Sequence, residues 1–107
     1  MPTISVITIN YNNLAGLKET VASVINQVEA DFEYLLIDGG SSDGSKEFIQ
    51  QNQHKFSYWV SEKDAGIYAA MNKGIDRAKG EYCLFLNSGD VLVDKGILNK
   101  VISLHRT

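Results

Sequence analysis

The sequence predicts an α/β domain built on an open, mostly parallel β-sheet with helices on both faces. Short apolar segments alternate with amphipathic segments of helical period, in the order β-α-β-α-β-α-β-α along the 107 residues. This alternation is typical of parallel strands joined by right-handed helical crossovers. A chain of this length forms one domain, and no repeat or linker divides it.

Four segments are predicted to be strands, because each is short and apolar and leads directly into a turn-forming cluster of Asn, Asp, Gly or Ser. The last of them is apolar throughout, as expected of a strand that is covered on both faces. It contains Cys83, which is therefore expected to be a small core residue. The expected strands are residues 5–9, 32–37, 56–60 and 82–86.

Three of the four expected helices have clear starting points. Asn13 precedes the first helix at the N-cap position, where its side chain can accept a hydrogen bond from a free backbone N–H. Asp43 or Ser42 is expected to cap the second helix, and the fourth begins near Asp94. These helices are expected at about 14–25, 45–53 and 94–104.

The third helix is expected to carry its apolar residues on one face and to end near Gly80 in a left-handed turn. That face should pack against the sheet. Its residues, at helical spacing, are Ile67, Met71, Ile75 and Ala78.

Charge and hydropathy exclude several functional classes. The ten basic and thirteen acidic residues are scattered and give a formal net charge of −3, without the basic surface of a nucleic-acid-binding protein. No apolar run approaches the ~20 residues that a membrane-spanning helix needs. We expect no signal peptide and no transmembrane segment, and hence a cytoplasmic location, which includes the inner face of the membrane for the full-length protein.

Polar side chains gather at the carboxyl ends of all four predicted strands, whereas the reverse connections carry ordinary surface residues. In an open parallel sheet these ends lie side by side, and ligands bind in the crevice between them. Turn chemistry alone also favours Asn, Asp, Gly and Ser at such positions. Their occurrence after every strand predicts a shared binding site.

Three residues of these loops suit a nucleotide ligand. The Asp38 carboxylate could accept a hydrogen bond from a base N–H or a ribose hydroxyl, or else bond its own backbone in a turn. Tyr11 could stack on a base, or cover the edge of the sheet. Asp90 could hold Mg²⁺ or Mn²⁺ against a diphosphate, or be a turn residue before the last helix.

Two alternative functions stay open on these residues. A nucleotidyltransferase would usually have a Gly-rich loop with a basic residue after its first strand, where this chain has Asn10, Tyr11 and Asn12. A non-catalytic receiver-like α/β domain would need two acidic residues there and a lysine after a late strand. Neither pattern is present in the sequence.

Six stretches, in order along nearly the whole chain, resemble family 2 inverting glycosyltransferases. The first two motifs of the family are similar to residues 5–12 (SVITINYN) and 36–45 (LIDGGSSDGS). Its bacterial capsule and exopolysaccharide branch is similar to residues 61–68 (SEKDAGIY), 71–74 (MNKG), 80–82 (GEY) and 85–90 (FLNSGD). The resemblance implies the GT-A fold, a Rossmann-like sheet that binds a nucleotide sugar, and a role in polysaccharide biosynthesis.

The same resemblance implies a nucleotide diphosphate sugar as donor and a saccharide or lipid-linked acceptor in the full enzyme. Transfer would be inverting and metal-assisted, with Mg²⁺ or Mn²⁺ at Asp90 and Asn87, bound only together with the nucleotide. The nucleotide-binding residues that it implies are Ile9, Asn10, Tyr11, Asp38, Asp64, Asn72 and Lys73.

The sequence departs from the family pattern at three places. Gly39 and Ala69 stand where aspartates are common, and Asp90 is the one acid in a metal element that usually has two or three. In this fold the general base and the acceptor site come from segments after the metal element, so we expect them beyond residue 107. Residues 1–107 are thus expected to form a single donor-binding domain, truncated before the acceptor half and inactive on its own.

Overall fold

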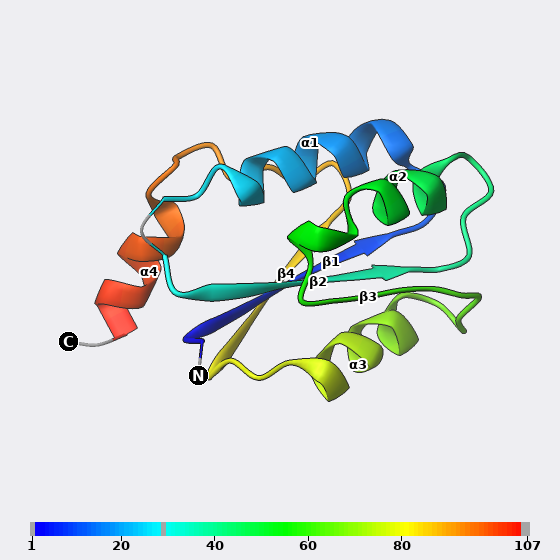
Figure 1. The fold of residues 1–107 in the computed structure, drawn as a ribbon. Helices are drawn as coiled ribbons and strands as arrows, with labels where there is room; N and C mark the ends of the chain where they lie inside the picture. Colours follow the sequence, from blue (N-terminus) through cyan, green and yellow to red (C-terminus); the bar gives the residue numbers. More distant parts are fainter. Residues whose placement is uncertain (1, 29, 106–107) are drawn as a thin grey trace.

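The structure, a computed structural model, describes residues 2–28 and 30–105. Its strands are β1 (Ile4–Asn10), β2 (Phe32–Asp38), β3 (Tyr58–Ser61) and β4 (Tyr82–Asn87). They form one sheet in the order β3-β2-β1-β4, and every pairing is parallel (Figure 1). The predicted open parallel sheet is confirmed.

The helices in the described ranges lie on both faces of this sheet, as predicted. Figure 1 shows α1 and α2 on one side and α3 on the other. No helix in these ranges has the length and hydropathy needed to cross a membrane. The bounds are α1 (Leu14–Ile25), α2 (Ser45–Gln51), α3 (Ile67–Arg77) and α4 (Ile97–His105), with a short 3₁₀ helix η1 (Gln53–Lys55).

The sheet is packed on both sides, because successive residues of a strand point to opposite faces. Val6 belongs to the apolar cluster that contains Leu17 of α1 and Ile49 of α2, together with α4 residues. The next residue, Ile7, belongs to the second cluster, which contains Ala70 of α3. Because both faces of the central strands are covered, the polar loops of the site meet at the carboxyl ends of the strands.

The first two helices begin with side-chain hydrogen bonds. Asn13 caps α1 as predicted, since its Oδ1 accepts from the Gly16 N–H at 3.1 Å. The N-cap position of α2 is Gly44, with a φ of 98°, one residue later than expected. Asp43 still serves the helix start, because its Oδ1 accepts from the Ser45 N–H at 3.1 Å.

The predicted apolar face of α3 is confirmed for Ala78, which packs against the second cluster, and is wrong for Ile67 and Ile75. The buried residues of this helix are Ala70 and Gly74, whereas Ile67 and Ile75 are about half exposed. A Cβ on Gly74 would lie 2.7 Å from Cγ2 of Ile7, so the helix backbone lies almost directly on the sheet. The small residues Ala70 and Gly74 make this close approach possible. The spacing of large apolar side chains in the sequence does not reveal such a contact.

The expected left-handed end of α3 at Gly80 is also wrong. The helix ends at Arg77, and its C-cap residue, Ala78, has an extended conformation. A Cβ on Gly80 would lie 2.7 Å from the Ser5 backbone nitrogen, so this glycine permits close packing of the α3–β4 connection against β1. The Gly80 N–H donates to Ser5 Oγ at 2.8 Å.

β4 does not have the two covered faces that its apolar sequence predicts. Tyr82 is 42% exposed and Cys83 is exposed, so the expectation of a core cysteine is wrong. The reason is topological, since β4 is an edge strand that pairs with β1 alone among the described strands. Within β4 only Leu86, near the carboxyl end of the strand, is buried.

Candidate functional site

A hollow of about 680 Å³ lies at the carboxyl ends of the strands, where the loops after β1, β2, β3 and β4 meet. This is the place that the four polar loops predict. Its walls come from all four loops and from the first turns of α3. The residues that line it are Ile9, Asn10, Tyr11, Asn13, Gly39, Gly40, Lys63, Asp64, Gly66, Ile67, Ala70, Asn87 and Ser88.

Five of the nine site residues named from the sequence line this hollow: Ile9, Asn10, Tyr11, Asp64 and Asn87. The other four lie nearby without lining it.

Asn72 and Lys73 do not reach the hollow, because they lie on α3 beyond the residues that face it. Asn72 is exposed. The Lys73 Nζ forms an ion pair with Glu62 Oε1 at 3.1 Å, which ties α3 to the loop after β3. In this structure Lys73 therefore supports the wall of the hollow from outside.

Asp38 is fully buried, and its carboxylate is engaged by four hydrogen bonds. Oδ1 accepts from Asn10 Nδ2 and Ser41 Oγ, both at 2.7 Å. Oδ2 accepts from the Ser41 N–H at 2.9 Å and from Ser61 Oγ at 2.8 Å. Burial alone would raise the pKa of Asp38, but the bonds from Ser41, Asn10 and Ser61 outweigh it and hold that pKa below its usual value.

Asp38 does not line the hollow, and its lone pairs are engaged by Asn10 and by the loops after β2 and β3. Ser41 comes from the loop after β2, and Ser61 is the last residue of β3. The residues around Asp38 in the sequence do not indicate that these two serines bond it. The sequence shows of each partner only that a serine lies at the end of a strand or just beyond it.

Asn10 cross-links the two halves of the site. Its side chain is 1% exposed, with Nδ2 donating to Asp38 Oδ1 and Oδ1 accepting from Ser88 Oγ at 2.6 Å. Ser88 belongs to the loop after β4, so this one amide joins the loops that flank β1 on either side. The sequence indicated Asn13 only as a helix cap and did not indicate Ser88 as a site residue; Asn13 Nδ2 donates to the Ser88 carbonyl at 3.1 Å.

Tyr11, Gly39 and Asp64 come together at one end of the hollow. A Cβ on Gly39 would lie 3.3 Å from Tyr11 Cδ1 and 3.4 Å from Asp64 Oδ2, so the glycine forms an open floor between them. The Tyr11 side chain is 65% exposed and free to cover a flat ligand. Lys63, which sequence reasoning missed, adds a positive charge to the same wall.

The Asp64 carboxylate holds an unused acceptor. Its Oδ1 accepts from the Gly66 N–H at 3.2 Å, but Oδ2 is buried and has no hydrogen-bond partner among the described residues. A buried charged acceptor without a partner costs free energy. A ligand that brings a hydrogen-bond donor would satisfy this oxygen once a shift of the surrounding loop exposes it to the hollow.

The predicted metal element is a tight turn at the end of β4. The Asn87 N–H donates to Asp90 Oδ2 at 3.0 Å, and the Asp90 N–H donates to the Asn87 carbonyl at 2.9 Å. Asn87 lines the hollow, and Asp90 is exposed beside it. Carboxylate and amide oxygens fit Mg²⁺ or Mn²⁺, but the described residues contain no group of three acidic, His or Cys side chains that would hold an ion alone.

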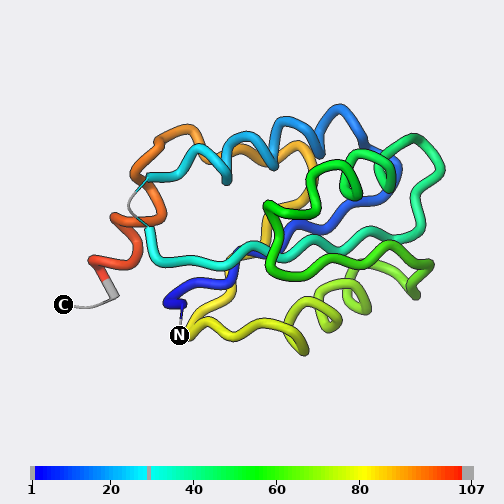
Figure 2. Tube along the Cα trace, in the orientation of Figure 1, coloured from blue at the N-terminus to red at the C-terminus, as the bar shows by residue number. Residues whose placement is uncertain are grey.

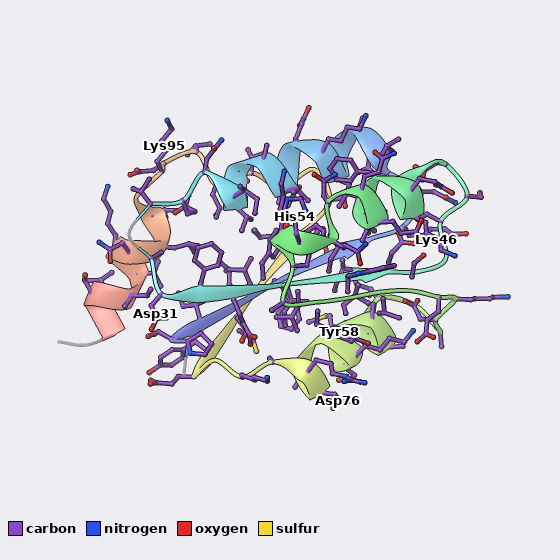
Figure 3. The ribbon with its side chains drawn as sticks, in the orientation of Figure 1. Asp31, Lys46, His54, Tyr58, Asp76 and Lys95 are labelled. Atoms are coloured by element: carbon purple, nitrogen blue, oxygen red, sulfur yellow. The ribbon has the colours of Figure 1, made fainter. Side chains whose placement is uncertain are left out.

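The remaining polar residues contribute little to this hollow. His54 is exposed on η1 and lies outside the lining residues (Figure 3). Tyr58 packs between the sheet and α3, with the Arg77 guanidinium 4.7 Å from the centre of its ring.

Comparison with known proteins gives a consistent result. The family described as glycosyl transferase family 2 matches residues 5–106. The Mycobacterium tuberculosis protein named uncharacterized glycosyltransferase Rv1514c is 47% identical over 90 residues, which cover 83% of this chain and 34% of that protein. The putative teichuronic acid biosynthesis glycosyltransferase TuaG of Bacillus subtilis is 35% identical over 92 residues, covering 83% and 36%.

Among solved structures, TarS 1–349 of S. aureus in complex with UDP has a TM-score of 0.85 and 25% identity, over 97% of this chain and 32% of that one. The fold is therefore that of the GT-A glycosyltransferases. The chain spans about a third of the length of these relatives. The family match extends over nearly all of the sequence, and the chain belongs to glycosyl transferase family 2.

Proposed function

We propose that the hollow binds a nucleotide diphosphate sugar and that residues 1–107 are the donor-binding domain of an inverting glycosyltransferase of polysaccharide synthesis. The observation that carries this proposal is the unpartnered Oδ2 of Asp64 beside Tyr11 and the open floor at Gly39. Two relatives support it: the S. aureus protein is described with UDP, and the B. subtilis protein is named for teichuronic acid biosynthesis.

The base would lie over Gly39, with one face against the Tyr11 ring. In that position a ring N–H can donate to Asp64 Oδ2 and satisfy its unused acceptor. Uracil, thymine and guanine carry such an N–H, whereas cytosine and adenine present a ring acceptor at the corresponding edge. The carboxylate therefore favours the first group and repels the second.

The diphosphate would lie between Lys63 and the Asn87–Asp90 turn. Lys63 attracts the negative charge of the phosphates. Asp90 and Asn87 are the residues that would hold Mg²⁺ or Mn²⁺, which when bound neutralises charge on the diphosphate as it leaves. With a single carboxylate in the turn, the nucleotide must supply the other ligands.

In the transfer step, an acceptor hydroxyl of a saccharide or lipid-linked substrate attacks the anomeric carbon of the sugar. The bond between that carbon and the diphosphate oxygen breaks, and the hydroxyl proton passes to a general base. A single in-line displacement of this kind inverts the anomeric configuration. We assign the general base and the acceptor site to segments of the enzyme outside residues 1–107, so the domain alone binds donor without transferring sugar.

Titration calorimetry with UDP, dTDP, GDP, CDP and ADP in the presence of Mn²⁺ tests the proposal. We expect UDP, dTDP or GDP to bind with a Kd on the order of 0.1–1 mM, or about −4 to −5.5 kcal/mol. CDP and ADP should bind about tenfold more weakly, because a charged acceptor left unpaired costs roughly 1–3 kcal/mol. Folded protein that gives no heat with any of the five would refute donor binding. Equal affinity for UDP and CDP would refute the base contact alone.

A further inference from the structure

One face of α1 carries a stripe of polar or small residues where an apolar face would be expected. Gly16, Thr20, Ser23 and Gln27 follow one another at helical spacing and continue just past the end of α1, and each is buried or half-buried. They face residues 88–96, the segment between β4 and α4, which runs beside α1 (Figure 2). This segment is held to α1 mainly by hydrogen bonds from the stripe to its backbone.

The far end of the stripe bonds the approach to α4. Ser23 Oγ accepts from the Leu92 N–H at 3.1 Å. Gln27 Nε2 donates to the Asp94 carbonyl at 2.8 Å, and its Oε1 accepts from the Leu98 N–H at 3.0 Å. These bonds hold the segment at Leu92, Asp94 and Leu98, after the Asn87–Asp90 turn.

Thr20 bonds the turn itself. Its hydroxyl is fully buried, accepts from the Gly89 N–H at 2.9 Å and donates to the Asp90 carbonyl at 2.7 Å. The Asn87 carbonyl lies 3.4 Å away, but a hydroxyl has one proton, and the shorter bond to Asp90 takes it. One oxygen atom thus holds the peptide groups on both sides of the Gly89–Asp90 linkage.

We propose that Thr20 is a positioning residue that fixes the Asn87–Asp90 turn, and through it the place where Asp90 meets the metal ion and the diphosphate. The proposal rests on the proposed function, because it takes Asp90 as the metal-binding carboxylate. Gly89 has a φ of 103°, and its N–H is shared between Thr20 Oγ1 and the Gly16 carbonyl at 3.1 Å. Without the hydroxyl, the turn loses its anchor to the helix on the Asp90 side.

Three variants separate positioning from general stability. Thr20→Val removes the hydroxyl and keeps the shape of the side chain. Thr20→Ser restores the hydroxyl on a smaller side chain. Ser23→Ala is the matched control, because the Ser23 hydroxyl accepts from the Leu92 N–H and donates to the Thr20 carbonyl but bonds none of residues 87–90.

UDP affinity with and without Mn²⁺, measured by titration calorimetry, is the main readout. We expect Thr20→Val to reduce the gain in UDP affinity that Mn²⁺ confers by about tenfold, the usual scale for residues that orient a metal ligand. UDP affinity without Mn²⁺ should stay unchanged in this variant, and Thr20→Ser should recover most of the Mn²⁺ gain. Ser23→Ala should leave both affinities unchanged while lowering the melting temperature.

Hydrogen exchange of the Gly89 amide is a second readout that needs no nucleotide. It should be faster in Thr20→Val than in the parent and in Thr20→Ser. A folded Thr20→Val with the full Mn²⁺ gain, or with an unchanged Gly89 exchange rate, would overturn the positioning role. Absence of UDP binding in the parent would instead refute the proposed function, and the exchange rates would still decide the role of Thr20. If Thr20→Val does not fold, the same measurements are made on Thr20→Cys, whose thiol is a weak donor and a weak acceptor of hydrogen bonds.

Discussion

The side chains of Asn10 and Asp38, which are directly opposite partners in the parallel ladder of β1 and β2, are joined by a hydrogen bond of 2.7 Å between Asn10 Nδ2 and Asp38 Oδ1. Both residues are buried at the ends of their strands. The pair therefore joins β1 and β2 at their carboxyl ends, next to the loops that form the hollow. Asp38 therefore supports the loops of the site, whereas Tyr11 and Asp64 line the hollow itself.

Asp38→Ala should destabilise the fold rather than weaken nucleotide binding directly. The change leaves the donors of Asn10, Ser41 and Ser61 without their buried acceptor. Hydrogen bonds to a charged group contribute about 1.5–3 kcal/mol each, without full additivity, so we expect a loss of about 3 kcal/mol or more in the free energy of unfolding. Urea denaturation measures it. Asp76→Ala, on the exposed side of α3 (Figure 3), is the control and should change little. Unchanged stability with lost UDP binding would show that Asp38 acts on the ligand.

The same carboxylate predicts how stability depends on pH. The folded-state pKa of Asp38 is held below its ordinary value by its hydrogen bonds. Such a group binds fewer protons in the folded state, so its contribution is fully present above the unfolded pKa of about 4 and is lost as the pH falls through the folded pKa. Glu33, whose pKa is also lowered, acts in the same direction.

Urea denaturation at pH values between about 7 and 3 should therefore show a free energy of unfolding that declines on the acid side. In Asp38→Asn the decline should be smaller, because one of the contributing carboxylates is gone, while Glu33, Asp43 and Asp94, whose pKa values are also lowered, remain. The same acid slope in this variant as in the parent protein would mean that Asp38 does not contribute to it.

Asp64→Ala should have the opposite profile to Asp38→Ala. Removal of Oδ2 takes away the acceptor for the base N–H, and we expect UDP to bind roughly tenfold more weakly or worse, on the scale of 1–3 kcal/mol for a bond to a charged group. The melting temperature should fall much less than in Asp38→Ala, because only the Oδ1 bond to the Gly66 N–H is lost and Oδ2 had no partner. Calorimetry and thermal unfolding measure the two effects, again with Asp76→Ala as the control. A large fall in melting temperature with intact UDP affinity would contradict this role.

Mn²⁺ should bind weakly to the free protein and appreciably only with UDP present. The described residues contain no group of three acidic, His or Cys side chains that would hold the ion without the nucleotide. Electron paramagnetic resonance of Mn²⁺, with and without UDP, gives the free-ion concentration directly. Asp90→Ala should abolish the nucleotide-dependent binding. Tight Mn²⁺ binding without UDP, or UDP binding that ignores both Mn²⁺ and Asp90→Ala, would argue that Asp90 is simply a turn residue.

The sequence was sufficient for the parallel sheet and for the position of the hollow at its carboxyl edge. Both follow from local patterns: apolar strands, helical periodicity between them, and polar residues after each strand. The direction of the Asp38 side chain could not be predicted in this way. It depends on Ser41 and Ser61, which reach Asp38 only once the loops have folded over the strand ends.

Two further errors have the same kind of cause. The buried face of α3 was partly misassigned because Gly74 allows the helix to lie against Ile7, and a glycine gives no hydrophobic signal. Cys83 was expected in the core because an apolar strand looks the same in a sequence whether it lies at the centre or at the edge of a sheet. Asp64 could be named only through family resemblance, since its unpartnered oxygen is a property of the folded loop.

The edge position of β4 affects how the domain behaves in solution. Beyond its pairing with β1, the described sheet presents a row of backbone groups on β4 beside the exposed Tyr82 and Cys83. Such an edge is a template for strand addition, which drives edge-to-edge self-association in proteins that do not cover it. Light scattering of residues 1–107 should therefore show particle size that grows with protein concentration, and Tyr82→Lys, which places a charge at the edge, should suppress that growth.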